Sequence, residues 1–141
     1  MFVTRVTFTN SGEKFANFEE ANGFKDKVVP WEYIEEIVFF KSDAMLDGIL
    51  HPVDFGSYDP DTNVLTYEFY HETMDHLRQF RQRLTENKVW EKSGELLLEL
   101  GWEMDFHVDT TEAFPENAVV VNLKQNITFV RPERRAELMA G

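Results

Sequence analysis

The stretch from Phe55 to Asn87, FGSYDPDTNVLTYEFYHETMDHLRQFRQRLTEN, contains the signals for a turn, a strand and a helix in succession. Residues 58–63 are rich in Asp, Asn and Pro, which favour turns. Proline fixes its backbone φ angle, and the side chains of Asp and Asn form hydrogen bonds with their own backbone. Residues 64–70 alternate between apolar and polar side chains, the pattern of a half-buried strand. Thr73 is suited to cap a helix over 73–86. The apolar residues of this helix share one arc of about 120° around its axis, and they are Met74, Leu77, Phe80 and Leu84.

Similar alternation predicts strands elsewhere in the chain. The predicted ranges are 2–9, 49–58, 102–109 and 118–130. We expect Ile49, Val53 and Phe55 to face inward, and Pro52 makes their strand an edge strand or a bulged one. The range 118–130 fits either one strand or a hairpin.

Two capping patterns predict shorter helices, one over 11–21 after Asn10 and one over 95–100 after Ser93. The segment that follows Pro30 fits a helix or a strand. Its β-branched and aromatic run favours a helical turn and then a strand that continues through Phe40.

The order of these elements predicts an α+β fold. We expect a single domain over residues 1–130, with an antiparallel sheet and two or three helices packed on one of its faces. The first half suits a ferredoxin-like arrangement. Residues 131–141 are expected to form a polar C-terminal tail.

The composition narrows the range of functions. The chain has 141 residues, with 26 acidic and 14 basic side chains, a net charge of -12 and a pI near 4.7. This charge opposes binding to nucleic acid and to anionic membranes. The absence of cysteine excludes disulfides and thiolate metal sites. No apolar stretch approaches the roughly 20 residues that span a bilayer, and no signal peptide is recognisable, so we expect a cytoplasmic protein.

Two acidic groups are candidates for binding a basic partner. They consist of Glu103, Asp105, His107 and Asp109 in one predicted strand, and Glu32, Glu35 and Glu36 in another segment. Asp105, His107 and Asp109 are also the less favoured candidates for a metal site. Residues two apart on one strand spread too widely to converge on one ion without help from another segment. We therefore expect neither a metal nor a cofactor.

The sequence contains no Gly-rich phosphate loop and no G-x-S-x-G nucleophile motif. We therefore favour a small, acidic, non-enzymatic protein that binds another protein. The expected role is inhibition of a basic or nucleic-acid-handling partner, as immunity proteins or phage-encoded proteins directed against host enzymes or defences do.

Two alternatives remain open. One is a structural subunit of a larger assembly, such as a phage particle. The other is a small dimeric α+β enzyme or ligand-binding protein that forms a homodimer through its sheet. In that case a pocket between sheet and helices would use His71 or His107 as the acid–base group.

Overall fold

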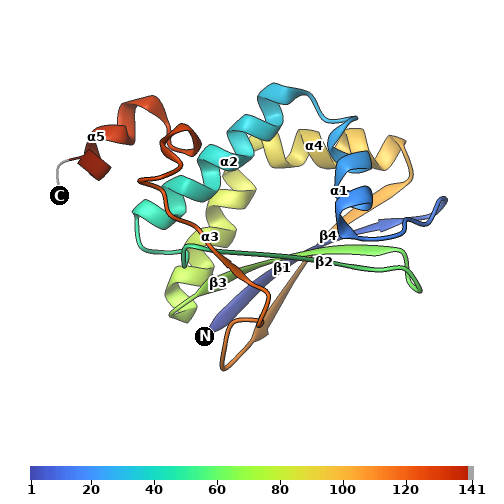
Figure 1. Ribbon diagram of the computed structural model, residues 1–141, viewed down its shortest axis with the longest axis horizontal. Coiled ribbons are helices and arrows are strands. Elements are labelled where there is room, and N and C mark those ends of the chain that lie inside the picture. The colour runs from blue at the N-terminus through green and yellow to red at the C-terminus, as the bar shows by residue number, and fades with distance from the viewer. Residues whose placement is uncertain (140–141) are drawn as a thin grey trace.

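The structure, a computed structural model, describes residues 1–139, and within them one five-stranded sheet is covered by helices (Figure 1). The elements are β1 (Phe2–Asn10), α1 (Phe18–Asp26), α2 (Trp31–Leu46), β2 (Val53–Asp59), β3 (Val64–His71), α3 (Met74–Glu86), α4 (Lys88–Glu99), β4 (Trp102–Thr110), β5 (Val119–Val120), the 3₁₀ helices η1 (Ile127–Phe129) and η2 (Pro132–Arg134), and α5 (Arg135–Met139). None of the described helices is long and apolar enough to cross a membrane.

The strand order is β4-β1-β3-β2-β5, and the neighbouring strands are antiparallel. As a result β1 and β2 are parallel to each other with β3 between them, and β3 and β4 are parallel with β1 between them. Two interleaved βαβ units of this kind form the βαββαβ ferredoxin-like arrangement. Here each crossover consists of two helices. The predicted α+β class is confirmed, and the ferredoxin-like arrangement includes both halves of the chain.

Helices α1 to α4 lie on one face of the sheet (Figure 1). Because side chains alternate along a strand, Val6 and its partners Tyr67 and Phe106 face these helices, whereas Arg5 and its partners Glu68 and His107 face outward. The main core lies between the two layers. Its fully buried large side chains include Leu65, Phe80, Leu97 and Trp102.

The hairpin and the helix predicted over 49–86 are largely confirmed, but two side chains predicted to face inward lie on the outer face of the sheet. Thr73 caps α3 by accepting a hydrogen bond from the His76 backbone N–H at 3.1 Å. However, Val53 and Phe55 lie on the outer face of β2, because Phe55 pairs with the outward residue Glu68. There they form a small second cluster with Val3, Tyr70 and Ala118.

The segment after Pro30 is a single 16-residue helix, α2, and the predicted strand through Phe40 is wrong. The helix is apolar on more than one side because it has neighbours on more than one side. Phe40 packs against Phe80 and Trp90 of the main core. Phe39 lies 5.4 Å from the guanidinium of Arg131, which belongs to the C-terminal segment. A helix covered on two sides lacks the single apolar stripe that sequence patterns detect.

Two other helices begin at different residues from those predicted. The side chain of Asn10 accepts a hydrogen bond from the Gly12 N–H at 2.7 Å, so it stabilises a local turn, and the cap of α1 is Asn17. Asn87 caps α4, which makes Ser93 a buried residue inside the helix. In the range 118–130 only β5 is strand, and η1 follows it.

The C-terminal segment is attached to α2 by two arginines. Arg131 Nη1 donates to Glu36 Oε2 at 2.8 Å and Arg131 Nε donates to Asp43 at 2.6 Å. Arg134 donates to Asp47 at 2.7 Å. The part of the predicted polar tail over 131–139 therefore packs on the helical layer, and residues 140–141 lie outside the described residues.

Buried polar contacts also anchor His71 at the end of β3. Its side chain is fully buried; Nδ1 donates to the Ile49 carbonyl at 2.8 Å, and Nε2 lies 2.9 Å from the Thr4 hydroxyl. With Nδ1 protonated, neutral His71 accepts from Thr4 through Nε2. Burial, the largest influence, lowers the pKa of His71 below its ordinary value.

Arg131→Ala should destabilise the protein by about 1–3 kcal/mol, because Glu36 and Asp43 both lose a charged donor in a half-buried site. Urea unfolding measures this loss, and the exposed Arg78→Ala on α3 is the matched control. Equal stabilities for the two variants would show that the arginine contacts do not hold the C-terminal segment.

The free energy of unfolding should decrease as the pH falls below about 6.5, the ordinary histidine pKa. Below that pH the imidazole of residue 71 binds a proton in the unfolded chain, whereas buried His71 in the folded protein stays neutral until a lower pH. Urea unfolding between about pH 7 and pH 5 should show a smaller decrease for His71→Gln than for the wild type. The exposed His107→Gln should keep the wild-type decrease, and identical slopes for all three proteins would contradict the role of His71.

Candidate functional site

A cavity of 680 Å³ lies between the helices and the inner face of the sheet. Helices α1, α2 and α4 line it on one side, and strands β1 to β4 line it on the other. Val119 and Asn117 of the segment that follows β4 complete its wall. The cavity is therefore bounded by both layers of the fold, the helices and the sheet, and by the segment that follows β4.

Aromatic side chains make up much of the cavity wall. Phe8, Phe18, Tyr67, Phe69 and Trp90 lie on the helical side of the sheet, and Phe55 reaches the cavity from the outer face of β2. The ring of Phe18 lies directly over Gly56 of β2. A Cβ at position 56 would come within 2.4 Å of that ring. Glycine at this position therefore allows α1 to approach the sheet closely, and Phe18 meets Tyr67 edge to face at 5.8 Å.

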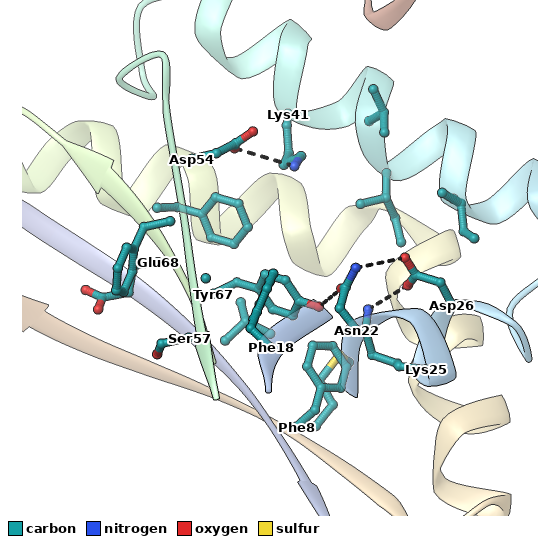
Figure 2. A pocket seen from close by; sticks show the side chains of 18 of the residues that line it. Phe8, Phe18, Asn22, Lys25, Asp26, Lys41, Asp54, Ser57, Tyr67 and Glu68 are labelled. Atoms are coloured by element: carbon teal, nitrogen blue, oxygen red, sulfur yellow. Dashed lines mark hydrogen bonds and ion pairs between the residues drawn. The ribbon is translucent and has the colours of Figure 1, made fainter. Parts of the chain in front are cut away.

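A chain of four polar side chains crosses one end of the cavity (Figure 2). The Tyr67 hydroxyl donates to the Asn22 side-chain oxygen, and the Asn22 amide donates to Asp26 Oδ2 at 3.4 Å. Lys25 Nζ lies 3.0 Å from Asp26 Oδ1. Asn22, Lys25 and Asp26 are positioned together because residues three and four apart share a face of a helix.

Lys25 is unusually enclosed for a lysine. Its side chain is 13% exposed, and Nζ lies 4.8 Å from the Phe8 ring centre and 5.0 Å from that of Tyr67. Burial lowers the pKa of Lys25, although the Asp26 carboxylate opposes this effect. The same burial raises the pKa of Tyr67. The ammonium group is thus held by one carboxylate and two aromatic faces instead of by solvent.

Helix α4 contributes two buried polar groups to the cavity wall. Trp90 and Ser93 are 6% and 5% exposed, and they lie three residues apart on the helix. Trp90 Nε1 and Ser93 Oγ have no hydrogen-bond partner among the described residues. Both atoms are fully enclosed by the chain, and a buried donor without an acceptor costs about 1–3 kcal/mol.

Lys41 of α2 and Asp54 of β2 form an ion pair in the wall of the cavity. Their charged atoms approach to 3.7 Å, and their side chains are 25% and 49% exposed (Figure 2). A weak, partly solvated ion pair of this kind contributes little to stability.

The sequence-predicted residues of β4 lie elsewhere, on the outer face. Glu103, Asp105, His107 and Asp109 are all exposed and form one row, as predicted. Arg5 of β1 donates to Asp109 at 3.2 Å, and the Thr7 hydroxyl lies 3.3 Å from His107 Nε2. Hydrogen bonding to the Thr110 N–H and to Arg5 lowers the pKa of Asp109.

The less favoured metal site is not formed within the described residues. No group of three or more His, Asp or Glu side chains in residues 1–139 is arranged to hold a metal ion. Asp105, His107 and Asp109 are spread along one extended strand, and their neighbours on β1 are Thr7, Arg5 and Val3. None of these neighbours is a carboxylate or an imidazole that could complete a coordination shell.

The second acidic group is divided by the fold. Glu32 and Glu35 are exposed on α2, but Glu36 is half-buried and bonded to Arg131. Hydrogen bonding to Arg131, the largest influence, lowers the pKa of Glu36. Glu36 therefore takes part in the attachment of the C-terminal segment, and its role in binding a partner protein stays a prediction.

The histidines considered as acid–base groups do not line the cavity. His71 is buried beneath α3 with both ring nitrogens engaged, and His107 lies on the opposite face of the sheet. The residues that do line it, Lys25, Tyr67 and Trp90, were not singled out from sequence. The one signal in the sequence that could have indicated this site is the helical spacing of Asn22, Lys25 and Asp26 within an aromatic-rich segment.

No protein-family model and no curated protein sequence matches this chain. Among solved structures, it is similar to the protein Atu4242 from Agrobacterium tumefaciens, with 20% sequence identity and a TM-score of 0.48. The similarity covers 82% of this chain and 98% of that one.

Proposed function

We propose that this protein binds a small, largely apolar molecule in the cavity between its helices and its sheet. The observation that carries the proposal is the cavity itself, 680 Å³ between the helices and the sheet, with aromatic side chains in its wall and a chain of polar side chains at one end.

The size and the lining of the cavity support this proposal. Sites for small molecules typically enclose about 300–1,000 Å³ and combine apolar walls with a few fixed polar groups. The volume of 680 Å³ falls within that range. The chain of hydrogen bonds from Tyr67 to Lys25 supplies fixed polar groups, since each member is held by the next.

Filling the cavity should abolish binding without unfolding the protein. Val38 lines the cavity from α2, and Val38→Phe would occupy part of its volume. Val108→Phe is the matched control, because Val108 is 48% exposed on β4 and does not line this cavity.

The measurement is thermal unfolding of the three proteins against a broad set of apolar compounds. A ligand that binds the native state and not the unfolded chain raises the melting temperature, and the increase grows with the ratio of free ligand concentration to Kd. Compounds that stabilise the wild type and Val108→Phe, but not Val38→Phe, are the expected result. A set in which no compound separates Val38→Phe from the other two proteins would contradict the proposal.

The outer face of the sheet favours a second candidate function, the binding of a basic protein. Glu103, Asp105 and Asp109 lie in one exposed row on that face, in a chain with a net charge of -12. Such a row would accelerate encounter with a positively charged partner. Inhibition of that partner, as proposed from the sequence, would follow if the row covered a functional surface.

This candidate predicts that acidic residues on the row determine affinity. Replacing Glu103 and Asp105 together by Lys should weaken binding to a basic partner by at least about tenfold and reduce its dependence on salt. The control is the same double reversal at Glu32 and Glu35 on α2. Calorimetry at low and high salt measures both effects, and equal losses for the two variants would contradict a role for β4.

A further inference from the structure

We propose that the free edge of β4 binds an extended segment of a partner protein as an added strand, and that basic and apolar side chains alternate along this segment. The inference rests on the second candidate function, the binding of a basic protein, and adds the conformation and the sequence pattern of the bound segment. Three features of β4 carry it: open backbone groups along its edge, an apolar groove beside its inner face, and carboxylates on its outer face.

The backbone groups of β4 divide between its two edges. Thr111, directly after the strand, donates its N–H to the Met1 carbonyl at 3.0 Å, and its carbonyl accepts from the Met1 amino group at 2.8 Å. The N–H and C=O groups of one residue point to the same edge of a strand, and the edge alternates from residue to residue. Those of the odd-numbered residues therefore face β1, and those of Met104, Phe106 and Val108 face the free edge.

Contacts at both ends of β4 agree with this assignment. Before the strand, the Gly101 carbonyl accepts from the Ser11 N–H at 3.0 Å, on the side of β1. At its end, the Thr110 N–H on the free edge donates to the Asp109 side chain at 2.8 Å. Among the described strands, β4 pairs with β1 alone. The middle of its free edge therefore offers backbone donors and acceptors to another strand.

A groove of 730 Å³ lies beside this edge, between β4 and the helices α3 and α4. Its apolar lining includes Met104 and Phe106 of β4 and Leu98 of α4, which is 63% exposed. Met104 lies against Gly94, where a Cβ would come within 2.7 Å of its terminal methyl group. Directly opposite residues of paired strands share a face of the sheet. The residues of an added strand opposite Met104 and Phe106 therefore direct their side chains toward the groove.

The groove favours apolar side chains at these inward positions. They would cover Leu98, Met104 and Phe106, whose apolar surface is partly open to solvent. The charged residues that also line the groove include both signs, and they are Arg81, Lys88, Glu91, Glu95 and Glu103. Selection in the groove therefore depends on apolar contact more than on charge.

The outer face of β4 favours basic side chains at the alternate positions of the added strand. These side chains would lie opposite Glu103, Asp105 and Asp109, which are exposed. Among the ion pairs of residues 1–139, Arg5 pairs with Asp109 at 3.2 Å, and none includes Glu103 or Asp105. Opposite charges on facing strands stabilise a sheet, so cations of the partner would compensate these two carboxylates.

A short peptide with this pattern tests the inference on the full chain. Acetyl-KVKVKVK-amide reads the same in both directions, so it fits a parallel or an antiparallel addition. It should bind, with an affinity that falls as salt rises. Acetyl-KSKSKSK-amide keeps the cations without the apolar side chains and should bind at least about tenfold more weakly. Acetyl-EVEVEVE-amide should not bind, and calorimetry measures all three affinities.

A single N-methyl group on the peptide tests the backbone pairing. Methylation of the central valine blocks an N–H on one edge of the peptide, and methylation of the next lysine blocks an N–H on the other edge. The valine N–H faces β4 in an antiparallel ladder, and the lysine N–H faces it in a parallel one. One methylated peptide should therefore lose at least about tenfold in affinity, and the other should keep most of it.

Hydrogen exchange of the unaltered protein reports the bound edge directly. In the free protein, the amide protons of Met104, Phe106 and Val108 should exchange faster than those of Asp105 and His107, which face β1. Saturation with acetyl-KVKVKVK-amide should slow the first three by at least about tenfold. NMR spectroscopy measures each rate.

A proline at the free edge supplies a variant. Val108→Pro removes an edge N–H, and proline is tolerated in an edge strand where that N–H faces solvent. The variant should lose at least about tenfold in affinity for acetyl-KVKVKVK-amide, whereas Val108→Thr should stay within about threefold of the wild type. Thermal unfolding verifies that both variants are folded.

The outcomes separate this inference from the second candidate function. Equal affinities for the valine and serine peptides, equal effects of the two N-methyl groups, or unchanged exchange of the three edge amides would overturn strand addition. If both basic peptides still bound, and bound more weakly after the double reversal of Glu103 and Asp105 to Lys, the acidic row would keep its role in binding basic partners. Failure of both basic peptides at low salt would contradict strand addition and that role together.

A strand from a second copy of the chain is the other occupant that the test detects. Protection of the Met104, Phe106 and Val108 amide protons that appears without peptide, and increases with protein concentration, would overturn the assignment of this edge to a basic partner.

Discussion

The fold depends on the pairing of β1 along its whole length with two strands that lie far from it in sequence. Phe2 pairs with His71 on one side and with Thr110 on the other. Each pairing closes a loop of more than 60 residues, and the entropic cost of closure must be recovered from the contacts made. Because β1 has a neighbouring strand on each side, alternate residues along it face the helices, and both helix pairs contribute side chains to the same core.

Sequence patterns predicted the parts of the fold that have one buried side and one solvated side. The β3 strand, the α3 helix and the β4 strand belong to this group, and their facing was correct. The prediction failed for α2, where Phe40 and Phe39 are buried by different neighbours, and the aromatic run resembled a strand. It also failed after residue 118, where Val119 and Val120 of β5 are exposed and the buried apolar side chains, Leu123 and Val130, lie outside any strand. Val130, for example, is fully buried just beyond a 3₁₀ turn.

The candidate site was less accessible to prediction than the fold. Lys25, Tyr67 and Trp90 come from three elements separated by more than 20 residues, and each is ordinary in its own segment. Their relation arises only when α1 and α4 are placed on the same face of the sheet. Likewise, the attachment of Arg131 to Glu36 joins positions 95 residues apart. Patterns within a short window of the chain contain no information on contacts of this range.

The acidic row on β4 has a consequence for the behaviour of the molecule at high concentration. Among the described strands, β4 has one neighbour, so its outer backbone groups are available to a strand from another copy. If two copies paired antiparallel about Phe106, Glu103 of one would lie opposite Asp109 of the other at both ends of the new ladder. Like charges placed directly opposite each other destabilise a sheet, and charged edges are a common protection against edge-to-edge aggregation. The same side chains that form the acidic face thus discourage growth of the sheet from one molecule into the next.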